Sequence, residues 1–319
     1  MDSQKQISIV IPLYNEAGNL EKLYSDLKDV LAKISCSCNY EIIFVDDGST
    51  DGSTEMVLRF AANDRAVKVI EFSRNFGKEL AITAGVNNCE GDACIIMDAD
   101  LQHPIGLIPE FVKKWEAGAE VVVGVREKNK NEGLTKKIGS ILFYKIIGMI
   151  SETEMVPRST DYRLLDRKVI KEFNRFTEKN RITRGLIAWL GFKKDYIYFA
   201  ANARYSGRAS YGFFKLIKLA LSAFVTHSLF PLKLAGYVGV FITIFSAITG
   251  IFIFTDKYIL NNLWNLNFTG TALLAVLIIF FVGIILCCLG LIALYIANIH
   301  EEVSHRPLYI VRRRENFDN

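Results

Sequence analysis

Short apolar runs and helical periodicities alternate along the first 125 residues. Runs rich in Ile and Val predict strands at 7–14, 40–47, 67–72, 93–98 and 120–125. Between them, apolar residues at helical spacing predict helices at 20–34, 51–62, 78–87 and 105–117. Strands that are apolar along nearly their whole length are buried on both faces. The alternation therefore predicts an α/β domain with a mostly parallel sheet and helices on both faces.

The pattern is looser after residue 126, and we expect the α/β domain to span residues 1–210. Residues 126–137 are polar and basic, which favours a loop. The elements predicted after this loop are an apolar helix at 138–150, a strand entering a helix over 161–170, a helix at 182–190 and a strand at 194–201. Residues 211–232 are apolar and helical in pattern but contain Lys215 and Lys218, which is typical of an amphipathic helix in a membrane interface.

Two later segments, 234–254 and 269–299, contain no charged residue. A membrane-spanning helix needs about 20 apolar residues. We therefore predict a transmembrane hairpin over 233–299, with spans at about 234–254 and 271–295, followed by a basic tail over 300–319. Two buried core helices are the alternative. Lys and Arg are concentrated outside the connection between the spans, which places both termini and the large domain in the cytoplasm.

Composition narrows the class of protein. The chain has 319 residues, 51% of them hydrophobic, and a net charge of +4. Such a balance excludes a disordered chain and gives no reason to expect a nucleic-acid partner. The six Cys residues show no metal-ligand spacing and are expected to be reduced. The apolar run at the N-terminus is too short for a signal peptide.

Clusters of mostly polar residues occur where each of the first four predicted strands ends. They are Pro12, Tyr14, Asn15 and Glu16; Asp46, Asp47, Gly48 and Ser49; Arg74, Asn75 and Lys78; and Asp98, Asp100, Gln102 and His103. Ligands bind beyond the carboxyl ends of the strands in an open parallel sheet, so these groups predict one binding site. Asp46 and Asp51, taken singly, also fit turn and helix-capping roles.

The segment Asp98-Ala99-Asp100 carries the clearest chemistry. Residues i and i+2 of an extended segment point the same way, so both carboxylates can face one cation. Oxygen ligands suit Mg²⁺ or Mn²⁺, which usually share their coordination with phosphates and water. The position of the pair after the fourth strand therefore predicts a metal site.

Six motifs occur in order along residues 5–230: IPLYNE, VDDGSTDGS, SRNFGKELAITAGV, DADLQHP, DYRLLDRKV and RGLIAWLGF. They resemble the inverting GT-A glycosyltransferases of family 2 that load sugars onto polyprenyl phosphates. These include dolichyl-phosphate mannose synthases and bacterial bactoprenol glucosyltransferases, and the predicted two-span tail resembles the bacterial branch. The resemblance implies a GT-A Rossmann-like fold and a location in the bacterial inner membrane.

The resemblance also implies roles for individual residues. The expected nucleotide-sugar contacts are Pro12, Tyr14, Glu16, Asp47, Asp98, Ala99, Asp100 and Arg126. The expected metal site consists of Asp98, Asp100 and Gln102. Asp161, the acid of the family's GDFRL motif, is the expected catalytic base, with Arg163 beside it as a second catalytic residue. Arg126, Arg204, Arg208 and Ser210 are expected around the acceptor phosphate.

The chain departs from the family pattern at several of these motifs. Thr160 replaces a usual Gly, Tyr162 replaces Phe, and His103 stands where many members have Asp. The phosphate loop RxxGESKY is RYSGRASY here, so Ser210 occupies the usual Lys position and Arg208 is expected to supply the charge.

The resemblance implies transfer of a hexose to undecaprenyl phosphate at a lipid bilayer, with Mg²⁺ or Mn²⁺ as cofactor. Glucose from UDP-glucose is the first choice, and mannose, N-acetylglucosamine, galactose or an aminoarabinose derivative stay open. The acceptor is already anionic, so Asp161 is expected to orient it, or to position Arg163, as much as to remove a proton. Arg163 also fits a structural role beside Asp161 or Asp166. A processive polysaccharide synthase, a nucleotidyltransferase and a non-catalytic membrane scaffold are the competing interpretations, and a homo-oligomer stays open.

Overall fold

The computed structural model describes residues 5–34, 38–127, 156, 158–179, 181–200, 248, 255, 270–304 and 306–317. The chain divides into two units, one made of Met1–Ser210 with Arg306–Asn319 and the other of Tyr211–His305. The predicted helices at 138–150 and 211–232 lie outside the described residues, as does nearly all of the predicted span at 234–254.

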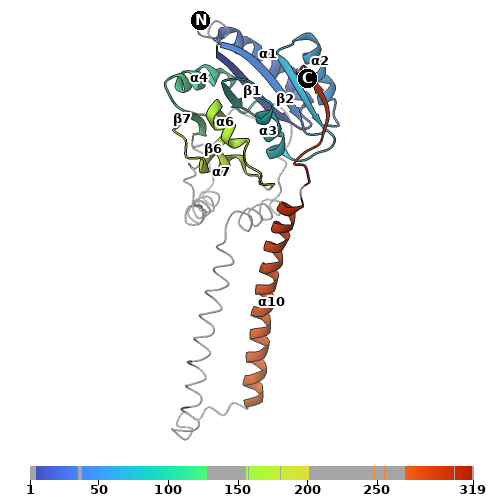
Figure 1. Cartoon of the computed structure of the whole chain (residues 1–319), viewed down its shortest axis with the longest axis vertical. Coiled ribbons are helices and arrows are strands. Elements are labelled where there is room, and N and C mark those ends of the chain that lie inside the picture. The colour runs from blue at the N-terminus through green and yellow to red at the C-terminus, as the bar shows by residue number, and fades with distance from the viewer. Residues whose placement is uncertain are drawn as a thin grey trace. The chain divides into compact units, whose positions relative to one another are not determined.

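The first unit is built on an eight-stranded sheet with the order β7-β5-β6-β4-β1-β2-β3-β8 (Figure 1). Its strands are β1 (Lys5–Leu13), β2 (Cys38–Asp46), β3 (Val67–Phe72), β4 (Ala93–Ile96), β5 (Val121–Arg126), β6 (Ser159–Asp166), β7 (Lys194–Phe199) and β8 (Val311–Glu315). The predicted strands match β1 to β7, because runs of apolar, largely β-branched residues fit strands that are buried on both faces.

The sheet is mixed, which qualifies the prediction of a mostly parallel one. Strands β3, β2, β1 and β4 are parallel to one another, as predicted, and β5 is parallel to β7. However, β6 runs antiparallel between β4 and β5, and β8 runs antiparallel to β3. Because Ile96 pairs with Arg163, the first residues of β6 lie at the edge where β4 ends. The reversal thus brings the start of β6 to the predicted site.

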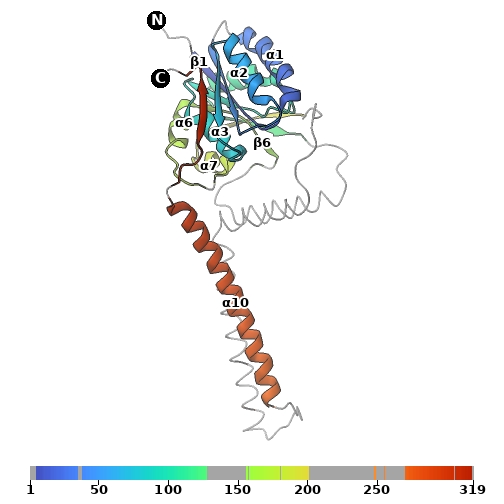
Figure 2. The ribbon, with the colours of Figure 1, turned by 90° about the vertical axis from the view of Figure 1, so that its right-hand side faces the viewer.

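Helices cover both faces of the sheet, as predicted. They are α1 (Ala17–Ile34), α2 (Ser53–Asn63), α3 (Lys78–Asn87), the 3-10 turn η1 (Ile105–Leu107), α4 (Ile108–Glu116), α6 (Arg167–Phe173) and α7 (Thr183–Trp189). One buried cluster joins α1, α2 and α4 to one face of the sheet, and a second joins α3, α6 and α7 to the other (Figure 2). Two separate cores therefore hold the sheet rigidly between them.

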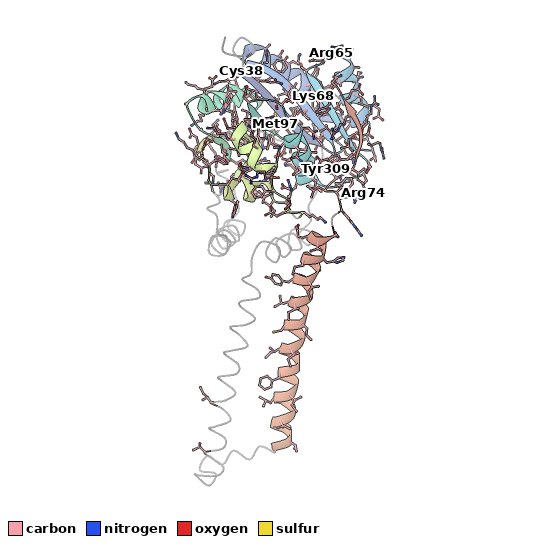
Figure 3. The ribbon with its side chains drawn as sticks, viewed as in Figure 1. Cys38, Arg65, Lys68, Arg74, Met97 and Tyr309 are labelled. Carbon is pink, nitrogen blue, oxygen red and sulfur yellow. The ribbon has the colours of Figure 1, made fainter. Side chains whose placement is uncertain are left out.

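The strand β8 was not predicted from the sequence, which indicates only a basic tail there. It covers the outer edge of β3, where the Ser73 amide donates to the Ile310 carbonyl at 2.9 Å. The ring of Tyr309, labelled in Figure 3, stacks on Phe72 with centroids 4.9 Å apart. Arg312 donates to Glu71 at 3.0 Å. Charged residues are typical of an edge strand, and they hide its strand character in the sequence.

In the second unit the uncharged stretch near the C-terminus forms a long helix, α10 (Gly270–Val303). A helix that crosses a bilayer needs a stretch of about 20 consecutive, mostly apolar residues. Within the described ranges, no helix meets the length and hydropathy that a span requires. This finding leaves the predicted transmembrane hairpin without support: its span at 271–295 falls in α10, and its span at 234–254 lies almost wholly outside the described residues. The same finding contradicts the predicted multi-pass location in a bacterial inner membrane.

Candidate active site

The candidate site lies where β1, β2 and β4 end and β6 begins. The loop after β2 is held against the loop after β3 by the buried carboxylate of Asp47, which accepts the backbone amides of Phe76 at 2.6 Å and Gly77 at 2.9 Å. Burial raises the pKa of Asp47, and the two amides oppose that effect. The close approach requires Gly48, since a Cβ there would lie 2.7 Å from the backbone carbonyl carbon of Arg74. Asp47 therefore fixes the shape of this edge.

The predicted nucleoside contacts differ in how accessible they are. Tyr14 is 45% exposed beyond the end of β1, whereas Pro12 is buried inside that strand. The Glu16 backbone amide donates to the Ser53 hydroxyl at 2.9 Å, so the end of β1 is tied to the start of α2. Tyr14 thus presents the open surface at this end of the site.

The loop after β4 holds the acidic pair and is organised around His103. The Nδ1 atom of His103 accepts the Asp98 backbone amide at 3.1 Å, and the ring stacks on Tyr162 with centroids 5.0 Å apart. Burial lowers the pKa of His103, which keeps the imidazole neutral. The Tyr162 hydroxyl donates to the Pro104 carbonyl at 3.1 Å. Two of the departures from the pattern of the resembling family, His103 and Tyr162, therefore pack against each other and hold Asp98 in place.

Asp98 and Asp100 remain the candidate metal ligands. The Oδ1 atom of Asp98 is buried, and no hydrogen bond reaches it from the described residues. Asp100 is 8% exposed and accepts the Gln102 backbone amide at 3.1 Å. No cluster of three or more His, Cys, Asp or Glu side chains forms a cation site in the described part of the chain. The buried oxygen of Asp98, with Asp100 two residues further along the same loop, fits a Mg²⁺ or Mn²⁺ ion that takes its other ligands from phosphate and water.

Gln102, the third predicted metal ligand, is engaged by an arginine. Its Oε1 atom accepts Nη2 of Arg126 at 2.6 Å, while the Nε atom of Arg126 is buried without a hydrogen bond. The amide therefore orients Arg126 at the end of β5. Ala99, between the two acids, is 3% exposed.

Asp161 lies at the centre of a network of charges. Arg184 of α7 donates to Oδ1 through Nε at 2.5 Å and to Oδ2 through Nη2 at 2.9 Å. The Lys78 ammonium, at the first residue of α3, lies 2.8 Å from Asp161 Oδ2 and 2.6 Å from Asp98 Oδ1. One ammonium thus joins the predicted metal ligand to the predicted base.

The charges around Asp161 set its protonation. Burial alone would raise the pKa of Asp161, but Arg184 and Lys78 hold it well below its usual range. Burial lowers the pKa of Lys78, and the attraction of Asp98 and Asp161 outweighs it, so the net shift is upward. At neutral pH the carboxylate is ionised and both partners are charged. A carboxylate of such low basicity is a poor proton acceptor.

Arg163 is influenced by the charges of Asp161 and Arg184 but does not contact Asp161 directly. It is 3% exposed, and Nη2 donates to the Thr160 carbonyl at 2.6 Å. Burial lowers the pKa of Arg163 to about 10. Among the described residues, no hydrogen bond or ion pair joins it to Asp161 or to Asp166, whose carboxylate instead caps α6 by accepting the Lys168 amide. Arg204, Arg208 and Ser210, predicted around the acceptor phosphate, lie outside the described residues.

Residues 8–173 match the family described as Glycosyl transferase family 2. The chain belongs to glycosyl transferase family 2. A relative named as an uncharacterized glycosyltransferase, YkcC of Bacillus subtilis (strain 168), is 39% identical over all of this chain and 97% of its own length. The bactoprenol glucosyl transferase of Shigella phage SfV is 32% identical over 97% of this chain and 99% of its own length.

A solved structure is also similar to this family 2 chain. It is the mannosyltransferase PcManGT from Pyrobaculum calidifontis in complex with GDP-Man and Mn²⁺, with a TM-score of 0.48 and 16% identity over 71% of this chain and 63% of that one. At that level the likeness bears on neither the metal nor the sugar. The family and its full-length relatives show that the chain is a glycosyltransferase.

Two residues of the glycosyltransferase site were not assigned a role from the sequence. Lys78 appears there only as one of the polar residues after the third strand, and Arg184 only within the motif RGLIAWLGF. Both residues lie within motifs that carry the resemblance to the family, so the motifs already marked them as candidates. Their partner could not be identified because the contact with Asp161 joins residues 83 and 23 positions apart in the chain.

Proposed function

We propose that this glycosyltransferase moves glucose from UDP-glucose to undecaprenyl phosphate with inversion at the anomeric carbon. Full-length similarity to proteins named bactoprenol glucosyl transferase supports this acceptor and this sugar. The observation that carries the chemistry is that Lys78 joins Asp98 to Asp161, while Arg184 also binds Asp161. It supports the proposal because a candidate metal ligand and two cations share one edge of the sheet, where an anionic donor and an anionic acceptor could meet.

The donor leaves a nucleoside diphosphate, so its departure requires positive charge. A Mg²⁺ or Mn²⁺ ion held by Asp98 and Asp100 would stabilise the charge that develops on the diphosphate. Arg126, oriented by Gln102, adds a guanidinium at the same end of the sheet. Tyr14 offers an exposed ring and Asp47 fixes the loop beside it, so these two residues form the nucleoside end of the proposed donor site.

The acceptor needs orientation more than deprotonation. A phosphate monoester is already an anion at neutral pH, so its oxygen can attack without a general base. Asp161 is ionised and doubly engaged, and its role in this proposal is to hold Arg184 and Lys78 where they face the acceptor phosphate. Both side chains are partly open, at 43% and 45% exposure, which leaves donors available for a phosphate. Attack opposite to the leaving diphosphate inverts the anomeric centre.

The test is a donor panel with the purified full chain. Radiolabelled UDP-glucose, UDP-N-acetylglucosamine, UDP-galactose, UDP-aminoarabinose and GDP-mannose are each incubated with undecaprenyl phosphate in detergent and Mn²⁺ or Mg²⁺. We expect label in the lipid fraction with UDP-glucose, and loss of that transfer in Asp100→Ala. Preference for another sugar would overturn the choice of glucose. Absence of transfer from every donor by a folded chain would overturn the proposed acceptor.

A further inference from the structure

Lys78 occupies an unusual position for a lysine near a candidate metal site. It follows Gly77 at the start of α3, and its ammonium lies 2.6 Å from Asp98 Oδ1 and 2.8 Å from Asp161 Oδ2. The oxygen of Asp98 that faces the ammonium is the one that no hydrogen bond from the described residues satisfies. Attraction of opposite charges therefore holds Lys78 to Asp98.

Of the two carboxylates that Lys78 contacts, Asp161 is held more firmly than Asp98. Asp161 is clamped by Arg184 and accepts a hydrogen bond from Lys78. The side chain of Asp98 is 23% exposed, against 6% for Asp161. Lysine is a compact charge on a flexible stem, and this one is 45% exposed, so its ammonium can leave Asp98 without leaving Asp161.

A divalent cation and the ammonium compete for the same oxygen. Two cations bound to one carboxylate oxygen would repel each other strongly in a partly buried site. A bound metal ion at Asp98 and Asp100 therefore requires that Lys78 move away. With the metal absent, Lys78 and Arg184 balance the charges of Asp98 and Asp161.

We propose that Lys78 is the resident counter-cation of Asp98 in the metal-free enzyme, and that it exchanges with the divalent cation while staying bound to Asp161. This inference rests on the metal site of the proposed function and adds a positioning residue to it. The ammonium keeps the two carboxylates from repelling each other before the metal arrives. Because the metal must displace this ammonium, it binds the free chain more weakly than it would bind the carboxylates alone. The cation therefore binds best together with the diphosphate of the donor, which adds ligands.

The test measures Mn²⁺ binding to the full chain without nucleotide, by the loss of the electron paramagnetic resonance signal of free Mn²⁺. We expect Lys78→Met to bind Mn²⁺ about tenfold more tightly than the wild type, because the competing cation is gone. Lys78→Arg, which keeps the charge, is expected to stay within about threefold of the wild type. Lys114→Met is the matched control, since Lys114 pairs with Asp195 at 3.0 Å and removing it changes the net charge equally.

The outcomes separate this inference from the proposed function. Equal or weaker Mn²⁺ binding by Lys78→Met would overturn the role of Lys78 and leave the metal site standing. Tighter binding in Lys114→Met by the same factor would also overturn it, because the effect would then be one of net charge. If neither the wild type nor Lys78→Met binds Mn²⁺, with or without UDP, the metal site itself is wrong. Lys78→Gln repeats the measurement in case the Met variant does not fold, and circular dichroism checks every variant.

Discussion

Replacing Asp161 by Asn tests whether this carboxylate anchors the site. The change keeps the shape of the side chain and removes the charge that Lys78 and Arg184 share. Breaking a fully buried ion pair costs about 3–5 kcal/mol, while an exposed pair contributes about 0–1 kcal/mol. Asp161 is 6% exposed, but its partners are 45% and 43% exposed. We therefore expect Asp161→Asn to lower the free energy of unfolding by about 2 kcal/mol.

Urea denaturation at pH 7 measures this loss directly, and thermal unfolding gives a second measure. For a unit of this size, about 2 kcal/mol corresponds to a fall in Tm of roughly 4–8 °C. Asp195→Asn is the matched control, because Asp195 pairs with Lys114 at 3.0 Å and its side chain is 45% exposed. That variant is expected to lose at most about 1 kcal/mol. Equal losses in the two variants would refute the reasoning.

The difference in the free energy of unfolding between wild type and Asp161→Asn also depends on pH, and this dependence gives an independent check. The pKa of Asp161 is lower in the folded chain than in the unfolded chain, because Arg184 and Lys78 outweigh burial. Such a group stabilises the fold above its unfolded pKa of about 3.9, and that contribution is lost as the pH falls toward the folded pKa. The difference in unfolding free energy between wild type and Asp161→Asn should thus be constant from about pH 8 to pH 5 and shrink below about pH 4. A difference that widens on acidification would contradict this account.

Three further changes test other parts of the site. Gly48→Ala should lower the free energy of unfolding by about 1–3 kcal/mol in urea, because φ is +75° there and a Cβ would meet the Arg74 backbone at 2.7 Å. An unchanged denaturation midpoint would show that the loops after β2 and β3 can separate freely. Tyr162→Phe removes the hydrogen bond to the Pro104 carbonyl and should cost about 1 kcal/mol in the same assay. Arg184→Lys breaks the two-point contact with Asp161 and should lower kcat for sugar transfer about tenfold, or about 1.4 kcal/mol, with little change in the donor KM. A rise in donor KM with kcat unchanged would instead place Arg184 at the nucleotide.

The central part of the fold could be predicted from the sequence because the pattern there is simple. Runs such as ISIVIPLY and YEIIFVDD fit strands buried on both faces, and they became β1 and β2. The strand β8 could not be found in this way, since its sequence VRRRE has the charges of an exposed segment. Its pairing with β3, together with the stacking of Tyr309 on Phe72, reveals it.

The site could be predicted in part for a similar reason. The acids after β4 follow directly from the rule that parallel strands present their carboxyl ends to ligands. The position of Asp161 does not follow from that rule, because it lies near the start of an antiparallel strand, whose direction the sequence does not indicate. The packing of His103 on Tyr162 is a contact between distant residues, and no local pattern predicts it. Long-range pairs of this kind need the tertiary structure.

The strand β8 has a consequence for how the protein is made. The sheet of the first unit consists of two pieces of chain, and the second piece, Arg306–Asn319, is synthesised after the first piece and after Tyr211–His305. Until then the edge of β3 has no partner, and an open strand edge can pair with other chains. A chain cut short before residue 306 would therefore contain every residue of the candidate site but would leave the edge of β3 prone to aggregation. Whether the edge of β3 is covered thus depends on a segment that lies more than 200 residues further along the chain.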